Sequence, residues 1–161
     1  MQAMRVLRLV VHVRTREPVL LLGEIDGERC VPVFLRRAQA DVISVGPRAE
    51  NDPPLPQDVL LPVVTGLGRS LRGAEITALR DGVFSAALVF DADQRVEVRP
   101  SDALAVAVRE GLPIGVAEEI LDEVGQPIAD LFPHGGDAPP AQQLQDFKEF
   151  LDEVDPEDFD R

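Results

Sequence analysis

The amino-acid sequence predicts an α+β protein in which a strand-strand-strand-helix unit occurs twice. Residues 95–99 alternate apolar and charged side chains, which indicates a half-buried strand. The six apolar residues 103–108 indicate a buried helix that has no polar face before Arg109 and that ends at Gly111. Residues 18–46 align with residues 83–111 at a constant offset of 65 without a gap. The hairpin turn, the strand end, the helix and its terminal glycine then fall in register. We therefore expect a duplicated unit that forms a mixed or antiparallel sheet with packed helices.

The elements of the first half follow from alternation, turn signals and helix breakers. Asp26-Gly27 is a strong hairpin signal. Pro32 lies within the strand that follows this turn and places that strand at a sheet edge or a bulge. The segment 19–22 is apolar on both faces, which is typical of a central strand. In order, the sequence predicts strands over 7–13, 19–22 and 30–35, a helix over 37–45, a proline-rich loop over 47–56 and a second helix over 58–67.

The second half repeats this pattern and is followed by a segment of different composition. We expect three strands, the first over 74–79, the second beginning at Val83 and the third over 95–99, followed by a helix that ends at Gly111. A short strand over 114–117 and a short helix over 118–124 come next. One domain is expected over 1–133. Residues 134–161 are predicted to be a flexible acidic tail with a short amphipathic helix, because glycines and prolines precede apolar residues at helical spacing: Leu144, Phe147, Leu151 and Val154. We expect this tail to be dispensable for folding and available to a protein partner.

Composition limits the classes of function. The 161 residues carry a formal net charge of −13, and residues 137–161, with nine acidic and two basic side chains, contribute −7 of it. Such a chain repels a phosphate backbone unless basic groups cluster locally or a metal ion intervenes. The single cysteine excludes an internal disulfide, which suits a reducing compartment. No apolar run approaches the ~20 residues of a membrane span. We expect a cytoplasmic protein with no membrane partner.

Several motifs resemble those of a known family. Arg99-Pro100-Ser101-Asp102-Ala103 is similar to the hallmark of the bifunctional nuclease family, a group of small bacterial and plant domains. Segments 53–60, 79–84 and 113–119 resemble, in order and spacing, its Pro-rich helix entry, its Asp-Gly-Thr-Phe turn and its Pro-Ile-x-Val-x-Glu segment. The resemblance covers roughly residues 5–125, and the segment 147–159 resembles the end of actinobacterial members. The resemblance to this family implies that the protein hydrolyses RNA and DNA and that single-stranded nucleic acid is its partner.

The candidate catalytic residues are four carboxylates: Asp58, Asp81, Asp102 and Glu118. Together they would gather a divalent metal ion for phosphodiester hydrolysis, although no spacing among them matches a metal motif. The candidate substrate-binding residues are Arg36, Arg37, Arg99 and Ser101, since arginines at equivalent strand ends in the two halves would flank one groove as phosphate contacts. A homo-oligomer in which two copies associate is left open by the sequence.

Each candidate has a structural alternative. Ser101 and Asp102 suit the cap of a helix, and Asp81 before a glycine suits a turn. Glu118 begins a helix, where the macrodipole stabilises acids. The arginines suit ion pairs with surface acids. The sequence leaves both interpretations of these residues open.

Two departures from the family pattern concern catalysis. Gln39 stands where the family usually has glutamate, and Pro56-Gln57 stands where it usually has Thr-His. Glutamine cannot take a proton or hold a metal by charge. The two histidines, His12 and His134, lie outside the family motifs, so a general base for neutral pH is not evident. Two hypotheses follow: a nuclease weakened at these positions, or a catalytically degenerate paralogue that acts as a regulatory or protein-interaction module.

Overall fold

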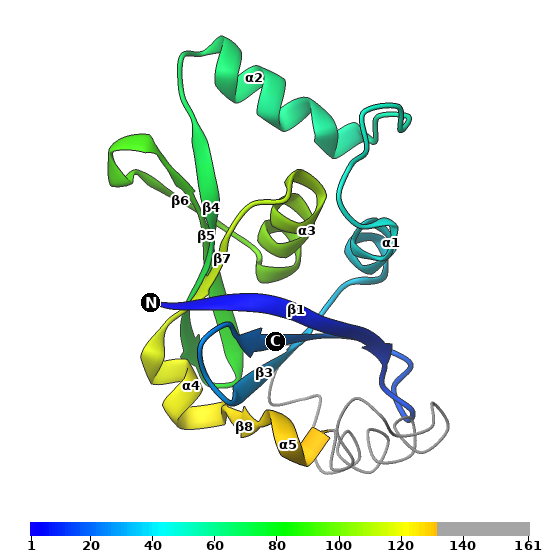
Figure 1. Cartoon of the computed structure of the whole chain (residues 1–161), viewed down its shortest axis with the longest axis vertical. Helices are drawn as coiled ribbons and strands as arrows, with labels where there is room; N and C mark the ends of the chain where they lie inside the picture. The colour runs from blue at the N-terminus through cyan, green and yellow to red at the C-terminus, as the bar shows by residue number, and fades with distance from the viewer. Residues whose placement is uncertain (132–161) are drawn as a thin grey trace.

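Strands from both halves pair into one mixed sheet (Figure 1). A computed structural model describes residues 1–131, and the expectations for the acidic tail and His134 lie outside these described residues. The described strands are β1 (Gln2–Val11), β2 (Pro18–Glu24), β3 (Arg29–Phe34), β4 (Leu71–Arg80), β5 (Val83–Phe90), β6 (Arg95–Val98), β7 (Ile114–Val116) and β8 (Gln126–Pro127). Their order across the sheet is β6-β5-β4-β7-β1-β2-β3-β8.

Helices and two 3-10 turns connect these strands. They are α1 (Arg37–Val45), the 3-10 turn η1 (Pro56–Val59), α2 (Leu60–Gly66), the 3-10 turn η2 (Asp91–Asp93), α3 (Pro100–Glu110), α4 (Glu118–Val124) and α5 (Ile128–Leu131). The predicted α+β class is therefore confirmed. None of the helices within residues 1–131 is long and apolar enough to cross a membrane.

The two halves share one order of elements. β1, β2 and β3 form an antiparallel meander that leads into α1, and β4, β5 and β6 form another that leads into α3. β7 joins them, antiparallel to β1 and parallel to β4. The two hairpins differ in register. In the first half Leu22 pairs with Val31, and the offset of 65 would therefore pair Ala87 with Val96 in the second half. Val96 instead pairs with Leu88. The gapless correspondence is thus shifted by one residue here, and superposition of the halves stays a prediction.

The sheet buries apolar side chains on both faces. α3 packs against β3, β4 and β5, and α1 packs against α3 and β1. The core under these helices includes Leu20, Leu22, Ile76 and Leu104. A second cluster on the other face comprises Val19, Leu21, Cys30 and Phe34. β2 is therefore buried on both faces, as its continuous apolar sequence predicts. Burial raises the pKa of the Cys30 thiol to about 12, which makes it unreactive.

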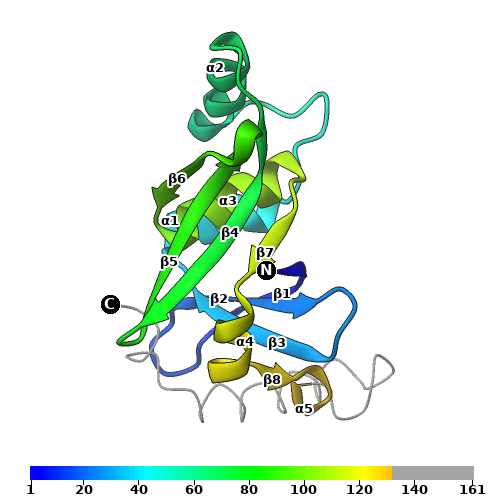
Figure 2. The same ribbon diagram turned by 90° about the vertical axis from the view of Figure 1, so that its left-hand side faces the viewer.

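The strand β3 and the helix α2 lie at opposite ends of the arrangement (Figures 1 and 2). β8 pairs with β3 only at Arg29 and Cys30. Pro32 therefore lies where β3 has no second neighbour among the described strands, as expected of a residue without an N–H group. α2 follows η1 at the end of the molecule away from β8 and α5, and only part of it packs against the core.

Candidate nucleic-acid interface

The first turns of α1 and α3 are joined to each other. The two helices lie side by side next to the sheet (Figures 1 and 2). The Gln39 Nε2 amide donates a hydrogen bond to Asp102 Oδ1 at 2.7 Å. Arg36 precedes α1 and Arg99 precedes α3, and both have the same extended backbone, with φ −73° and ψ 146° for Arg36 and φ −67° and ψ 145° for Arg99. The strand ends of both halves thus deliver equivalent arginines to the helix starts.

Neither Ser101 nor Asp102 caps α3 with its side chain. Pro100 is the first helical residue, which costs no hydrogen bond because the first amide of a helix has no intrahelical acceptor. Ser101 follows at 6% exposure and Asp102 occupies the third position. The Asp102 carboxylate instead accepts a hydrogen bond from Arg99 Nε at 2.8 Å. The carboxylate therefore links Arg99 and Gln39, and the capping alternative for these two side chains is wrong.

This junction has the features of an anion-binding surface. No side chain caps α1 or α3, so the first-turn amides of both helices have no side-chain acceptor among the described residues. The macrodipoles place partial positive charge at the same ends. Arg36, Arg37 and Arg99 are exposed beside them. Guanidinium groups and helix amides both bind phosphate oxygens.

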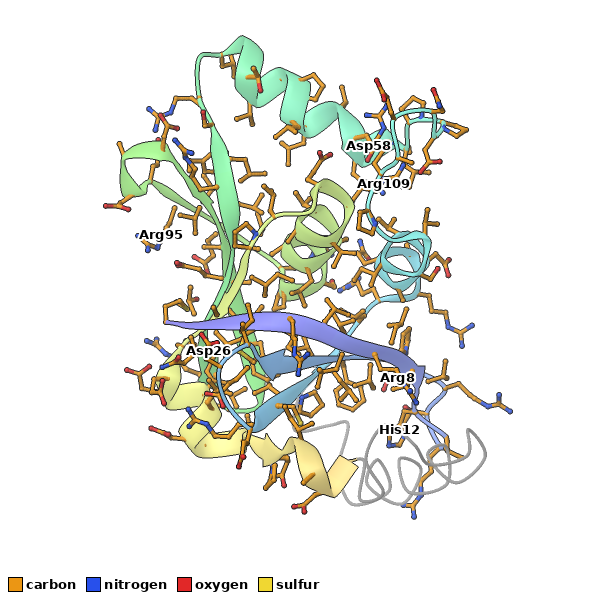
Figure 3. All side chains as sticks on the ribbon, viewed as in Figure 1. Arg8, His12, Asp26, Asp58, Arg95 and Arg109 are labelled. Atoms are coloured by element: carbon orange, nitrogen blue, oxygen red, sulfur yellow. The ribbon has the colours of Figure 1, made fainter. Side chains whose placement is uncertain are left out.

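Asp58 lies in a different place, in a buried ion pair with Arg109 (Figure 3). Both side chains are 1% exposed. Arg109 Nε donates to Asp58 Oδ1 at 3.1 Å, and Nη2 donates to Oδ2 at 3.2 Å. The Leu55 amide donates to Oδ2 at 2.7 Å. This carboxylate therefore fastens η1 to the last turn of α3.

The pair makes stability depend on pH. The Arg109 hydrogen bond lowers the pKa of Asp58, burial raises it, and the Leu55 amide lowers it further, with a net pKa below the ordinary value. A carboxyl whose pKa is depressed in the folded state stabilises the protein above its unfolded pKa. That contribution is lost as the pH falls through the folded pKa. We therefore assign Asp58 a structural role.

Glu118 belongs to a third cluster, centred on Arg29. Arg29 Nη2 donates to Glu118 Oε1 at 2.6 Å and to Glu24 Oε1 at 2.7 Å, and Nη1 donates to Asp122 Oδ1 at 2.9 Å. The Gln2 amide donates to the other Glu118 oxygen. The Arg29 hydrogen bond, followed by that of Gln2, lowers the pKa of Glu118. The cluster ties α4 to the β2–β3 hairpin.

Asp81 is a turn residue. It adopts φ 51° and Gly82 adopts φ 76°, which forms the tight connection between β4 and β5. Aspartate tolerates this left-handed region better than most residues. Its side chain is exposed at the hairpin tip, as the structural alternative from the sequence predicts.

The four candidate carboxylates do not gather. Asp102 lies at the start of α3, and Arg109, the partner of Asp58, lies seven residues further on, or ~10 Å along the helix axis. Glu118 and Asp81 belong to other elements. Within residues 1–131, no three His, Cys, Asp or Glu side chains come close enough to hold a metal ion. The residues present therefore do not fit the divalent ion that four gathered carboxylates would hold.

Both glutamines that depart from the family pattern carry a buried amide atom without a hydrogen-bond partner among the described residues. Gln39 Oε1 and Gln57 Nε2 are these atoms. Gln57 precedes Asp58 in η1, whereas Gln39 faces Asp102. His12 is buried after β1, where its Nδ1 lies 3.2 Å from the Thr15 amide nitrogen. The substitutions therefore affect two separate places, one at each end of α3.

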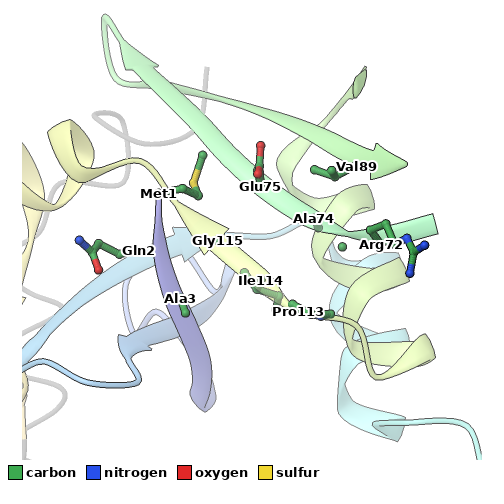
Figure 4. Close-up of a pocket in the computed structure, with 11 residues that line it drawn as sticks. Met1, Gln2, Ala3, Arg72, Ala74, Glu75, Val89, Pro113, Ile114 and Gly115 are labelled. Atoms are coloured by element: carbon green, nitrogen blue, oxygen red, sulfur yellow. The ribbon is translucent and has the colours of Figure 1, made fainter. Parts of the chain in front are cut away.

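A shallow hollow lies where β1, β4 and β7 meet (Figure 4). Its volume is about 240 Å³, and its lining includes Met1, Arg72, Glu75 and Val89. Glu75 is occupied by an ion pair with Arg95, Nε to Oε2 at 2.8 Å. The described residues that line it include no histidine, cysteine or serine. The hollow offers neither a nucleophile nor a free carboxylate from this part of the chain, so we do not assign the functional site there.

The roles of Arg109 and Arg29 were not evident from the sequence. The pattern predicts Arg109 at the start of a polar helix face, but it is almost completely buried. One signal was available: an arginine in a helix that is otherwise apolar needs a buried acid. The identity of that acid was not readable, because 51 residues separate Arg109 from Asp58.

Comparison with known proteins identifies the family. The model of the bifunctional nuclease domain matches residues 20–129. The chain is also 37% identical over 161 residues to the uncharacterized proteins MT1877 and Rv1829 from two strains of Mycobacterium tuberculosis, which covers 99% of this chain and 98% of each relative. The chain belongs to the bifunctional nuclease domain family.

The family pattern gives the Gln39–Asp102 contact a specific meaning. The resemblance implies that bifunctional nuclease domains usually carry glutamate at this position. Two carboxyl groups at hydrogen-bond distance cannot both ionise and therefore share a proton. In this chain the N–H group of the Gln39 amide donates the hydrogen bond to Asp102, so no shared proton is needed to hold the two side chains together. The contact therefore does not depend on titration of a second carboxyl group.

In this bifunctional nuclease domain, we expect Asp58→Ala to lower the Tm by roughly 10–15 °C, because removing one partner of a buried ion pair typically costs about 3–5 kcal/mol. Thermal unfolding at neutral pH measures the loss. The double variant Asp58→Leu with Arg109→Met, which removes both charges, should recover much of it. An unchanged Tm in Asp58→Ala would show that the pair does not stabilise the fold.

Gln39→Glu should make stability depend on pH in a new way. The raised pKa of the shared proton means that the folded state binds more protons than the unfolded state, so stability is kept at low pH and lost as the pH rises through that pKa. The free energy of unfolding, measured with urea at about pH 5 and at about pH 8, tests this because the two values lie on either side of the raised pKa expected for such a carboxyl pair. Gln39→Met, which adds no charge, is the control. Equal pH dependence in both variants would contradict the shared proton.

Proposed function

We propose that this bifunctional nuclease domain binds single-stranded nucleic acid at the N-terminal turns of α1 and α3. The observation that carries the proposal is the junction of the two helix starts through Gln39 and Asp102, with exposed Arg36, Arg37 and Arg99 beside it. Uncapped helix starts and guanidinium groups together recognise phosphate, which every nucleic-acid strand offers.

The distribution of charge supports this surface despite the acidic total. Residues 1–48 contain eight basic and five acidic side chains, whereas the whole chain has a net charge of −13. Several acids of the remaining chain are neutralised by arginines, as in the ion pairs of Asp58, Asp91 and Glu75. Residues 1–48 therefore have a local excess of basic side chains, of which Arg29 is paired with acids, within a molecule whose net charge repels phosphate at long range.

We propose further that hydrolysis is weak. Phosphodiester cleavage requires a group that activates water and positive charge near the developing charge on phosphorus. Arg36, Arg37 and Arg99 supply the charge, but Asp102, the carboxylate beside them, already accepts hydrogen bonds from Arg99 and Gln39. Loss of a general base typically costs about 10²–10⁴-fold in rate. The residues at the junction therefore favour binding over chemistry.

The second candidate function is a catalytically degenerate paralogue that regulates or binds another protein. A specific observation favours it: three of the four candidate carboxylates, Asp58, Asp102 and Glu118, are committed to arginines of the same chain. In this case nucleic acid would not bind at the helix junction, and titration with an oligonucleotide distinguishes the two functions.

Arg36→Ala combined with Arg99→Ala should reduce affinity for a fluorescently labelled single-stranded oligonucleotide by about tenfold or more, and anisotropy titrations measure it. The slope of log affinity against log salt should become shallower by roughly 0.7 for each phosphate that the variant no longer neutralises. Arg80→Ala, which removes one positive charge from the exposed end of β4, should leave the affinity almost unchanged. Equal reductions in both proteins, or no binding at low salt, would refute the interface.

Cleavage of the same oligonucleotide should stay near the buffer blank, and Gln39→Glu combined with Gln57→His should raise it if those positions carry chemistry. Because we assign Asp58 a structural role, Arg36→Ala with Arg99→Ala, made in both the unsubstituted and the restored protein, is the control for contaminating nuclease. Robust cleavage by the unsubstituted protein, abolished in the arginine variant, would show an active nuclease. No cleavage in the restored variant would leave the degenerate module as the better account.

A further inference from the structure

The sheet ends at β6, and this edge is exposed. β6 stands first in the strand order, so none of the other described strands pairs with its outer side. Arg95, Val96 and Glu97 are exposed, and Val96 is 45% exposed although its side chain is apolar. Figure 1 shows β6 on the outer side of β5, away from α1 and α3. An open strand edge is a template for pairing with another strand.

Two residues of β6 direct their backbone groups away from the sheet. In an antiparallel pair, hydrogen-bonded and non-hydrogen-bonded residue pairs alternate along the strand. The Phe90 amide donates to the Gln94 carbonyl at 2.8 Å, so Gln94 and, two residues later, Val96 are the residues that bond to β5. The N–H and C=O groups of Arg95 and Glu97 therefore point outwards. They offer two donors and two acceptors to a strand that lies alongside.

The side chains of this edge carry opposite charges on one face of the sheet. Arg95 and Glu97 lie on that face, and Val96 lies on the other. Glu97 has no hydrogen bond or ion pair with another of the described residues. Arg95 lies on the outer side of the molecule (Figure 3), where it pairs with Glu75 and still has 47% of its side chain exposed. Arg29 holds three carboxylates in this same chain, so the Glu75 pair does not prevent Arg95 from taking a second carboxylate.

We propose that β6 pairs with β6 of a second copy of this chain, antiparallel and around a two-fold axis at Val96. With Val96 opposite Val96 of the second copy, Arg95 lies opposite Glu97 of that copy, and Glu97 lies opposite its Arg95. The residues whose backbone groups point outwards then form two hydrogen-bonded pairs, each with two N–H···O bonds. Opposite charges directly across two strands stabilise the pairing.

Other registers satisfy fewer of these conditions. An axis at Arg95 or at Glu97 places two like charges directly opposite each other and keeps only one hydrogen-bonded pair. An axis between two residues places apolar side chains opposite charged ones, because opposite residues share a face. With the axis at Val96, the two exposed valines cover each other. Backbone, charge and apolar contact therefore select the same register.

The position of α3 leaves the edge accessible. α3 packs against β3, β4 and β5, which lie inward of β6 in the sheet. The net charge of −13 on each copy opposes association at low salt, whereas physiological salt screens charges that are more than about 8 Å apart. The cross-strand contacts are much closer than this distance. We therefore expect the dimer at physiological ionic strength.

The contact is short, which determines its strength and its size. β6 has four residues, so the interface belongs to the small, transient class, for which we expect a Kd on the order of 0.1 mM. Both copies use the same edge, so the arrangement closes at two chains and does not grow into a filament.

Sedimentation equilibrium of the full-length protein without nucleic acid tests the dimer independently of the proposed function. From about 20 µM to about 1 mM protein in about 0.15 M salt, the average mass should rise from that of one chain towards that of two. Glu97→Arg, which places two arginines opposite each other, should weaken association at least about tenfold. Glu123→Arg makes the same change at an exposed residue of α4 and should associate like the unsubstituted protein.

A mixture of two variants tests the register. Arg95→Glu, combined with Glu75→Gln to remove the carboxylate that the new side chain would meet, places two acids opposite each other and should also be monomeric. When this variant is mixed with Glu97→Arg, opposite charges face each other again at both positions. The mixture should therefore associate with about the affinity of the unsubstituted protein, and an unchanged Tm verifies that each variant folds.

Four results would overturn the proposal. A monomer throughout the concentration range would show that the edge does not take a second copy. A dimer that Glu97→Arg leaves unchanged would place the contact on another surface. Two folded variants that do not associate when mixed would refute the register. Growth beyond two chains would refute the two-fold arrangement.

Discussion

The buried arginine Arg109 determines how the two halves are connected. A guanidinium group that loses its water needs a carboxylate and further acceptors, and Asp58 supplies two oxygens from η1. The same residue accepts a hydrogen bond from the Arg48 amide at its carbonyl, and its Nη1 lies 3.8 Å from Asp52. The long connection between α1 and α2 is therefore held at three points by one residue of α3. The position of α2 follows from this anchor.

The two ends of α3 have different chemistry. Its C-terminal turn is occupied by the buried Arg109 ion pair, whereas its N-terminal turn lies beside that of α1 with exposed arginines. An anion would therefore find amides and guanidinium groups at one end only. The separation also explains why these two candidate carboxylates cannot act together: Asp102 lies in the first turn of α3, whereas Asp58, in η1, is paired with Arg109 in the last turn of α3.

Family membership and site chemistry give different kinds of information about this chain. The family match defines a bifunctional nuclease domain. Gln39, an amide that cannot titrate, stands where the resemblance implies that the family usually has glutamate, and it donates a hydrogen bond to Asp102. A carboxylate hydrogen-bonded to an arginine and an amide keeps its position well, but it has few lone pairs left for water or substrate. The rigidity of the junction and the weak hydrolysis that we propose therefore have the same cause.

Sequence by itself determined the features that depend on a few neighbouring residues. The apolar run of β2 predicted burial on both faces, the Asp81-Gly82 pair predicted the turn between β4 and β5, and Gly111 adopts the left-handed conformation that ends α3. These outcomes follow from backbone preferences and from the period of apolar residues, which are local properties. The class of fold and the family were accessible for the same reason.

Only the tertiary structure decided which charged groups meet. The sequence offers Asp58 as a catalytic candidate and its partner Arg109 as the beginning of a polar face, because nothing local shows that helix packing brings them together. The same holds for Arg29, whose three acidic partners come from a hairpin and from α4. The hairpin of β5 and β6 is shifted by one residue relative to its counterpart, which sequence identity could not reveal. Ion pairs and register depend on the packing of distant segments, and that packing is a property of the whole core.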